Sequence, residues 1–382
     1  MFEQDINFFT IYFDMKTYIS AIGTANPPHK VDQQDAARFM EESLALSNEE
    51  RRKLKALYRL SGIRSRYSVL KDYSKSYGNY SFFPNSENLE PFPSTEDRMQ
   101  VYGEEATKLS LEAIQNSLSQ LPGFDVQEVT HLVTVSCTGM HAPGIDIEIV
   151  RQLGLPGNVR RTAINFMGCY AAFNALKVAN DICRAEPKSK VLVVCVELCT
   201  LHFQNKADED NLLSNAIFGD GAAALLVETE QRDCLQLSFE NFYCDLAYEG
   251  INDMAWRIGN QGFEMRLSSY IPDFIKGGIK KLSDRLLDTF KNQLSGKVYY
   301  AVHPGGKRIL SSIEQALGLQ KEDNRYAYEV LENYGNMSSS TVLFVLKALM
   351  GDMKRSDNGK SVVSFAFGPG LTLESMLLRI KA

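Results

Sequence analysis

The sequence predicts an α/β fold made of two similar halves. Short apolar runs typical of buried strands alternate with helical segments between about residues 106 and 198, and the pattern restarts after residue 235. In addition, "FGDGAAALLVE" at 218–228 resembles "FGPGLTLESML" at 367–377, late in each half. A match of this length could arise by chance, but a true repeat would indicate a duplicated α/β unit. The paired glycines predict tight hairpins, because only glycine adopts positive φ without penalty.

Elements of the first half follow from periodicity and from the flanking residues. The run "ATKLSLEAIQNSLSQL" at 106–121 has apolar residues at helical spacing and ends before Pro122 and Gly123, which predicts an amphipathic helix. After it we expect a strand at 131–137, a strand at 161–166, a helix from about Cys169 to Arg184 and a strand at 190–198.

The second half repeats this alternation. We expect strands near 235–243, 262–270 and 297–302, a helix at 270–290, and helices after 306 and 338. The predicted domains are an N-terminal half at 15–235 and a C-terminal half at 236–382. Residues 1–14 form an extension or a misassigned start, because Met15 begins a more natural domain. No Pro-rich or low-complexity linker separates the halves, so we expect one shared core.

Composition excludes several classes of function. The net charge of -6, with basic residues interspersed among acids, argues against nucleic acid as a partner. Seven cysteines lie mostly in apolar runs without CxxC spacing, and only five histidines accompany them, which predicts reduced thiols, a cytoplasmic location and no metal site. The N-terminus carries acids where an export signal needs basic residues, and charges interrupt its apolar residues, so we expect no membrane span.

Three residues at strand-to-helix junctions are candidates for chemistry. Cys169 lies between a strand and a helix, where the positive helix N-terminus would lower the thiol pKa, although small buried cysteines often fill such junctions. His303 follows a strand and precedes a Gly-Gly turn, at the sheet edge where α/β sites form. Asn336 precedes a Ser-rich helix start and by local rules is a turn or cap residue. Together they could form a thiolate–imidazolium pair with an amide donor for an oxyanion.

These segments resemble the type III polyketide synthases, the chalcone synthase-like branch of the thiolase superfamily, and in particular their microbial members. The likeness extends from about residue 17 to the end and includes "GTANPP", "CTGMHAPGIDIEIVRQLGL", "NFMGCYAAFNAL", "NAIFGDGAAALLVE", "HPGGKRIL", "NYGNMSS" and "FGPGLTLE". The resemblance implies a five-layered αβαβα thiolase fold of two pseudo-repeated halves and a homodimer. It also implies that Cys169, His303 and Asn336 are catalytic.

The implied reaction uses CoA thioesters as substrates and no resident cofactor. Cys169 would hold an acyl-CoA starter as a thioester, with His303 pairing with the thiolate. His303 and Asn336 would stabilise the enolate formed when malonyl-CoA loses CO2, and the enolate would extend the bound acyl group. Cyclisation would give a pyrone, a resorcinol or a related aromatic polyketide, and we favour a fatty acyl-CoA starter.

The same resemblance also implies which residues line the substrate pocket and bind CoA. Phe218 matches an aromatic gatekeeper, and Met265, with Phe263 as the alternative, matches a second one. Three cations, Lys53, Arg59 and Lys307, are candidates for binding CoA phosphates, although a solvated helix face explains such residues equally well. Further residues expected to line the pocket are Cys137, Cys199, His202, Trp256 and Ser338. Several of these differ from plant chalcone synthases, and Ala366 replaces a loop glycine of the family.

Two other functions share part of this pattern. A β-ketoacyl synthase III-like enzyme that uses acyl carrier protein is the nearer alternative, but its histidine segment reads His-Gln-Ala-Asn where this chain has His-Pro-Gly-Gly. A Cys-His-Asn hydrolase is the more remote one, because cysteine peptidases lack the paired Phe-Gly-x-Gly segments.

Overall fold

The computed structural model describes residues 15–248, 254–267 and 271–382, so the expected extension at 1–14 lies outside the described residues. The strands are β1 (Tyr18–Ala25), β2 (His29–Asp32), β3 (Ser65–Ser68), β4 (His131–Ser136), β5 (Arg160–Asn165), β6 (Val191–Leu198), β7 (Asp220–Glu228), β8 (Gln236–Leu246), β9 (Met254–Gly259), β10 (Gly262–Leu267), β11 (Val298–Val302), β12 (Ser361–Gly368) and β13 (Thr372–Lys381). The α-helices are α2 (Gln33–Ser43), α3 (Asn48–Leu60), α4 (Thr95–Leu118), α5 (Ile145–Leu153), α6 (Ala171–Ala185), α7 (Glu209–Ile217), α8 (Ile271–Phe290), α9 (Lys307–Leu317), α10 (Arg325–Tyr334) and α11 (Thr341–Asp352).

A nine-stranded sheet in the order β11-β12-β13-β8-β1-β7-β6-β4-β5 carries the duplication. Outward from the β1–β8 contact, β1 is antiparallel to β7, β7 is antiparallel to β6, and β6 is parallel to β4. On the other side β8 is antiparallel to β13, β13 is antiparallel to β12, and β12 is parallel to β11. The same directions in the same order confirm the predicted repeat. The position of the domain boundary between residues 235 and 236 stays a prediction.

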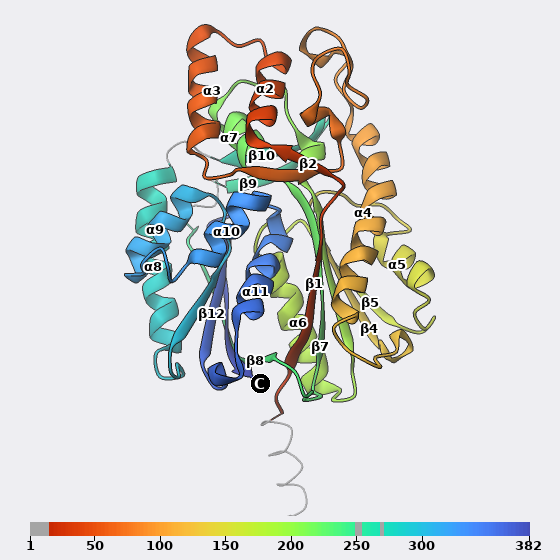
Figure 1. Ribbon diagram of the computed structural model, residues 1–382, viewed down its shortest axis with the longest axis vertical. Helices are drawn as coiled ribbons and strands as arrows, with labels where there is room; N and C mark the ends of the chain where they lie inside the picture. Colours follow the sequence, from red (N-terminus) through yellow and green to blue (C-terminus); the bar gives the residue numbers. More distant parts are fainter. Residues whose placement is uncertain (1–14, 249–253, 268–270) are drawn as a thin grey trace, which may run out of the picture.

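Helices cover the sheet in layers (Figure 1). The central helix α6 packs on β4, β6 and β7 of its own half and on β13 of the other, while α11 packs on β11 and β12 and also on β1 and β7. On the outer faces, α4 covers β1, β6 and β7, and α8 covers β8 and β13. This arrangement is the five-layered αβαβα fold that the resemblance implied. No helix in the described residues is long and apolar enough to cross a membrane.

Both faces of the central strands are buried, as β6 illustrates. Val191, Val193 and Cys195 pack with the core around α6 and α11, whereas Leu192 and Val194 pack with the core under the outer helices. Because side chains alternate across a strand, a strand buried on both faces is apolar at nearly every position, and in β6 the exception is Glu197. This requirement explains the continuous apolar run that predicted the strand.

The expected elements are present, with differences at their ends. The helix predicted at 106–121 is the second part of α4, which begins at Thr95 because the Ser94 hydroxyl and the Asp97 carboxylate form a capping box. The strand expected at 262–270 is β10, but it pairs with β9 in a separate two-stranded sheet. Ala366, which replaces a family glycine, lies in β12 opposite Glu374 and has no positive φ.

The hairpin predicted at both Phe-Gly-x-Gly segments is right for the second and wrong for the first. Phe367 to Gly370 joins the antiparallel pair β12 and β13, and Gly370 has a φ of 73°. Phe218 to Gly221 instead lies where α7 leads into β7, because residues 199–219, which include α7, separate β7 from its antiparallel neighbour β6. Position 219 must be glycine because the Tyr334 backbone comes very close to it. A Cβ atom at this position would lie 2.8 Å from the Tyr334 carbonyl oxygen.

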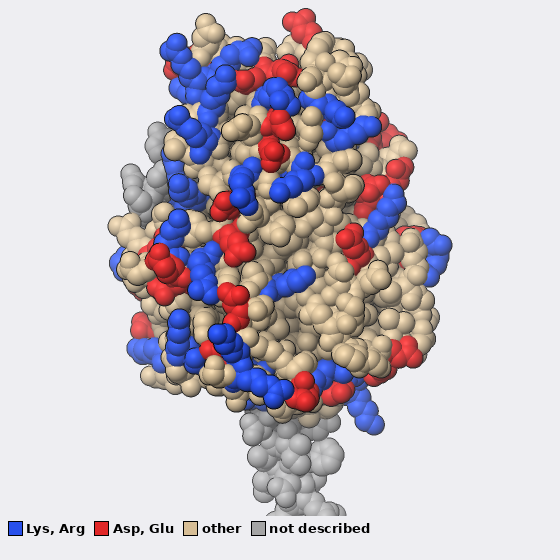
Figure 2. Space-filling model, in the orientation of Figure 1, with Lys and Arg blue, Asp and Glu red and all other residues tan. Residues whose placement is uncertain are grey.

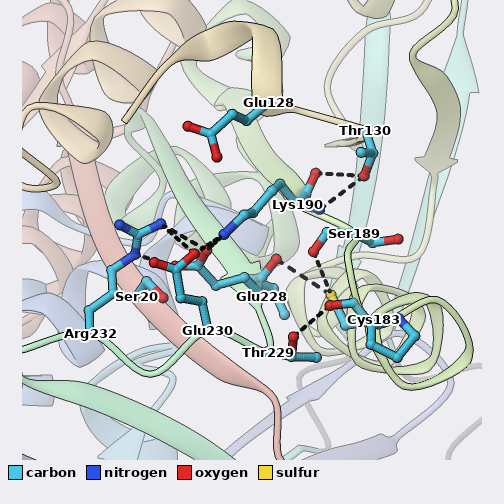
Figure 3. A network of polar contacts seen from close by, with 12 residues as sticks. Ser20, Glu128, Thr130, Cys183, Ser189, Lys190, Glu228, Thr229, Glu230 and Arg232 are labelled. Carbon is cyan, nitrogen blue, oxygen red and sulfur yellow. Dashed lines mark hydrogen bonds and ion pairs between the residues drawn. The ribbon is translucent and has the colours of Figure 1, made fainter. Parts of the chain in front are cut away.

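At the end of the sheet where β7 finishes, a buried carboxylate is held by two cations (Figure 3). Glu228 has no exposed side-chain surface and bonds to Arg232 Nε at 2.6 Å and to Lys190 Nζ. Burial acts to raise the pKa of Glu228, but hydrogen bonds from Arg232 and Lys190 outweigh it and hold the pKa below its ordinary value. Glu230 contacts the same two cations from an exposed position.

Glu228→Gln is expected to lower the free energy of unfolding by about 1.5–3 kcal/mol, because it leaves two cations without their buried counter-charge. Since the folded-state pKa is lowered, this stabilisation is complete above the ordinary glutamate pKa and is lost as the pH falls through the lowered value. Urea denaturation at pH 7 and pH 4 measures both effects. Glu230→Gln is the matched control and should cost less than about 1 kcal/mol, because Glu230 is 51% exposed. Equal costs for the two variants would contradict the prediction.

Candidate active site

A cavity of about 1090 Å³ brings the three candidate residues together. Cys169, His303 and Asn336 all line it, although they lie 134 and 33 residues apart along the chain (303 − 169 and 336 − 303). Most of its remaining lining comes from η4 (Cys199–His202) and from α3, α7, α9 and the β9–β10 hairpin. These elements gather over the upper end of the sheet in Figure 1.

The duplicated topology explains why the three residues meet. His303 directly follows β11, and Cys137 directly follows β4, the equivalent strand of the first half. Cys169 precedes α6, and Asn336 precedes η6 (Ser338–Ser340) and the equivalent helix α11. Since α6 packs against η6, which leads into α11, and the two helices share one core, the N-terminal ends of both helices and the ends of β4 and β11 all border the cavity.

Cys169 lies just before the N-terminus of α6, as predicted. Gly168, with a φ of 81°, makes the turn, and a Cβ atom there would collide with Pro369. The thiol is 9% exposed. Burial raises the pKa of Cys169 to about 11, and hydrogen bonds with Ser338 and Asn336 only partly oppose it. The expectation of a lowered pKa is therefore wrong, because desolvation of the thiol outweighs the effect of the helix N-terminus.

His303 is 1% exposed, and neither of its ring nitrogens has a hydrogen-bond partner. Burial lowers the pKa of His303 to about 3, which favours the neutral imidazole near pH 7. A buried polar group without a partner costs free energy, and such groups persist where a ligand will pair with them. Burial therefore disfavours the charged form of both the Cys169 thiol and the His303 imidazole.

Asn336 has a fixed orientation. Its Oδ1 accepts hydrogen bonds from the Ser338 backbone N–H at 2.8 Å and from the Thr341 hydroxyl at 3.3 Å. Its Nδ2 makes one long bond of 3.4 Å to the Gly305 carbonyl, which leaves donor capacity on the amide. Ser338 has a φ of 49°, a strained value for a residue with a side chain. The local interpretation of Asn336 as a turn residue is correct, and the turn also aims its amide nitrogen.

A buried carboxylate lies among the cavity thiols. Glu197, at the end of β6, accepts hydrogen bonds from the Cys137 backbone N–H at 2.9 Å and from the hydroxyls of Thr138 and Ser339. Burial raises the pKa of Glu197. Its negative charge also acts to raise the pKa of the Cys137 and Cys199 thiols, which burial already raises well above the usual range. Both thiols line the cavity, as expected.

Comparison with known proteins decides the family. The model of the N-terminal domain of chalcone and stilbene synthases matches residues 13–231, and the model of their C-terminal domain matches residues 245–381. The chain belongs to this family of type III polyketide synthases. The family match favours this assignment over the carrier-protein-dependent enzyme and the hydrolase.

Individual relatives cover nearly all of this synthase. An alpha-pyrone synthesis polyketide synthase-like protein, Pks18 of Mycobacterium tuberculosis, is 31% identical over 370 residues, covering 95% of this chain and 91% of the relative. Type III polyketide synthase A of Arabidopsis thaliana is 30% identical, covering 95% and 93%. The crystal structure of the C-terminal type III polyketide synthase domain of Steely1 from Dictyostelium superimposes with a TM-score of 0.86 at 29% identity, covering 95% and 99%.

Aromatic and sulfur-containing side chains wall the cavity of the synthase. Phe218 lines the cavity, and so do Met265 and Phe263, the two candidates for the second gatekeeper. The structure therefore does not distinguish between these two candidates. Met265 lies on β10 opposite Trp256 on β9, and Phe263 stacks on His202 with ring centroids 4.1 Å apart. All the residues predicted for the pocket are therefore in the cavity wall.

The predicted phosphate-binding cations are only partly at the cavity. Lys53 and Lys307 line it, whereas Arg59 is exposed on α3 and does not. Arg308, which sequence reasoning missed although it follows Lys307 directly, also lines the cavity. Figure 2 shows lysine and arginine side chains gathered over α3. Arg66 is a different case, because its Nη1 bonds to the carbonyls of Asn215 and Phe218 and its role is to hold that turn.

Proposed function

We propose that this synthase condenses malonyl-CoA units onto an acyl-CoA starter held on Cys169 and releases a cyclised polyketide. The observation that supports this most is the meeting of the Cys169 thiol, the partnerless His303 ring and the oriented Asn336 amide in one large cavity. CoA thioesters are substrates here, and no resident cofactor or metal takes part. The seven free thiols suit a reducing compartment, so we also infer a cytoplasmic location.

Loading of the starter begins from the neutral pair. As the thioester carbonyl enters, His303 takes the proton of the Cys169 thiol, and the sulfur attacks the carbonyl carbon. The carbon–sulfur bond to CoA then breaks, and the CoA thiolate takes a proton. Burial disfavours a free thiolate, so the proton leaves the sulfur as the sulfur attacks the carbonyl carbon.

Extension uses the same residues in a second role. The bond between the methylene carbon of malonyl-CoA and its carboxylate breaks, CO2 leaves, and the electron pair forms an enolate. N–H groups of His303 and Asn336 stabilise the charge on the enolate oxygen. The enolate carbon attacks the acyl carbonyl on Cys169 and the carbon–sulfur bond to the enzyme breaks, which leaves a β-ketoacyl-CoA ready for another cycle.

The cavity favours a fatty acyl starter. Its lining includes five apolar side chains: Met40, Leu212, Ile217, Met254 and Ile279. These side chains offer dispersion and hydrophobic contacts but no hydrogen bonds to a polar starter. A long alkyl chain suits this wall, and short extension of such a starter closes to a pyrone or a resorcinol.

A panel of acyl-CoA starters from acetyl to palmitoyl, each incubated with malonyl-CoA and analysed by mass spectrometry, tests the function. We expect pyrones or resorcinols to form, with the highest kcat/KM for long acyl chains. Reaction with carrier-protein-bound malonate but with no CoA thioester would overturn the proposal. In a separate incubation with peptide p-nitroanilides, release of p-nitroaniline by a protein that forms no condensation product would instead support a hydrolase.

We further propose that the synthase is a homodimer formed along β5. In the described residues β5 pairs only with β4, and most of its residues are exposed. Nearby Met140 and Ile147 are 43% and 40% exposed. Unpaired edge strands are templates for association. Light scattering at micromolar concentration should give about twice the mass of 42.9 kDa, and Ile147→Glu should shift the protein toward monomer. A wild-type monomer would contradict this proposal.

A further inference from the structure

The β9–β10 hairpin forms a wall of the cavity without belonging to the main sheet. Its two strands pair with each other and with no other strand of the described residues. Trp256 on β9 and Phe263 and Met265 on β10 all line the cavity. Outside this pair of strands, a backbone hydrogen bond from the Gly370 N–H to the Met254 carbonyl oxygen, at 3.0 Å, holds the start of β9. The position of the rest of this wall relative to Cys169 therefore depends on a few separate contacts rather than on a continuous ladder of strand hydrogen bonds.

His202, in η4, makes the most direct of these contacts. Its Nε2 bonds to the Thr138 carbonyl oxygen at 2.7 Å, and its Nδ1 bonds to the backbone N–H of Phe263 at 2.9 Å. A carbonyl can only accept and an N–H can only donate, so one tautomer satisfies both, with the proton on Nε2. The ring also lies parallel to the Phe263 ring, at 7° between planes. His202 thus bridges β10 and the loop after β4.

Burial favours a single protonation state of the His202 ring. His202 is 5% exposed, and burial lowers its pKa to about 3. A proton added to Nδ1 would face the Phe263 N–H and break that bond. The imidazole is therefore a neutral connector near pH 7, with both nitrogens already used inside the protein.

Trp256 supplies a parallel connection. Its Nε1 donates to the Cys137 carbonyl oxygen at 2.6 Å, and its ring packs edge-on against His202 with centroids 5.6 Å apart. Two consecutive carbonyls, of Cys137 and Thr138, are thus tied to the hairpin wall. The same loop reaches the nucleophile, because Cys137 Sγ accepts a hydrogen bond from the backbone N–H of Gly168 at 3.0 Å.

The turn of the hairpin is held separately. The Thr95 N–H donates to the Asn260 carbonyl oxygen, and the Thr95 hydroxyl accepts from the Gly262 N–H, each at 2.9 Å. Gln204 Nε2 donates to the Gln261 carbonyl oxygen at 2.9 Å. These contacts secure the turn, whereas His202 and Trp256 secure the strands that face the cavity.

We propose that His202 is a positioning residue, a hydrogen-bonded brace that sets the distance between the β9–β10 wall and the Cys169 loop. It does not touch the reacting atoms. By fixing the wall that faces the growing chain, it limits how many extensions the cavity accommodates before release. This role in product length rests on the proposed function, but the brace itself does not.

Two substitutions separate the hydrogen bonds from the ring. His202→Phe keeps a ring to stack on Phe263 but leaves the Thr138 carbonyl and the Phe263 N–H without partners. His202→Gln lacks the ring but can donate to one group and accept from the other. The matched control is His131→Gln, because His131 is also 5% exposed but lies at the start of β4, away from the hairpin.

Hydrogen exchange of peptides spanning residues 254–267, in the enzyme without substrates, tests the brace. We expect His202→Phe to raise exchange in this segment at least about fivefold, and His202→Gln to restore most of the protection. His131→Gln should leave the segment unchanged. Wild-type exchange in His202→Phe, or equal loosening in both His202 variants, would overturn the proposal.

Product analysis tests the consequence. His202→Phe should broaden the distribution of polyketide lengths and lower kcat. The KM for malonyl-CoA should change little, because Lys53, Lys307 and Arg308, cations that line the cavity, are unchanged. His202→Gln should return the distribution toward that of the wild type. A loosened hairpin with unchanged product lengths would overturn the claim about chain length. A wild-type enzyme that makes no polyketide would contradict the proposed function, while the exchange experiment would still decide the brace.

Discussion

Replacing Cys169 with alanine is expected to lower polyketide formation by at least about 10⁴-fold, because no other group can carry the acyl chain through extension. The variant should still convert malonyl-CoA to acetyl-CoA and CO2, since His303 and Asn336 stabilise the enolate without the thiol. Intact-mass spectrometry after incubation with acyl-CoA should show an acyl adduct on the wild type and none on the variant.

A buried thiol outside the cavity provides the control for Cys169→Ala. Cys195 has no exposed surface on β6 and does not line the cavity, so Cys195→Ala should retain the adduct and most of the turnover. An acyl adduct of unchanged yield on the Cys169 variant would show that Cys137, Cys199 or another group is the nucleophile.

The sequence predicted the order of strands and helices because both halves contain short apolar runs with clear ends. The position of Cys169 at a helix N-terminus followed from the same signals. The wrong hairpin at Phe218 shows the limit of local patterns. "FGDG" and "FGPG" look alike, but the chain between β6 and β7 includes α7, and only strand pairing in three dimensions reveals which glycines join neighbouring strands.

The sequence did not predict the pKa shifts and hydrogen-bond partners of the site residues correctly. A helix terminus suggested a lowered thiol pKa, yet burial raises the pKa of Cys169 to about 11 because the surrounding layers exclude water. The role of His202 was equally hidden, since its two partners, Thr138 and Phe263, lie 64 and 61 residues away. Composition and periodicity predict which residues are buried but not which distant backbone groups they bond.

His303→Gln and Asn336→Asp are expected to separate loading from decarboxylation. Glutamine can donate a hydrogen bond but cannot take the thiol proton, so His303→Gln should slow acyl loading by about 10²–10⁴-fold and keep part of the decarboxylation. Aspartate keeps the oxygen that accepts from the Ser338 N–H and the Thr341 hydroxyl, but it loses the NH2 donor. Asn336→Asp should therefore slow acetyl-CoA formation by about 10²–10³-fold while loading persists.

Rapid-quench measurement of acyl-enzyme formation and of acetyl-CoA release gives the two rates independently. The opposite pattern in the two variants follows only if His303 acts as both base and donor and Asn336 acts as donor alone. Equal loss of both rates in Asn336→Asp would mean that the turn before α11 had moved, which a changed melting temperature would reveal. Unchanged decarboxylation in Asn336→Asp at the wild-type melting temperature would instead leave the His303 ring, whose nitrogens lack protein partners, as the main support of the enolate.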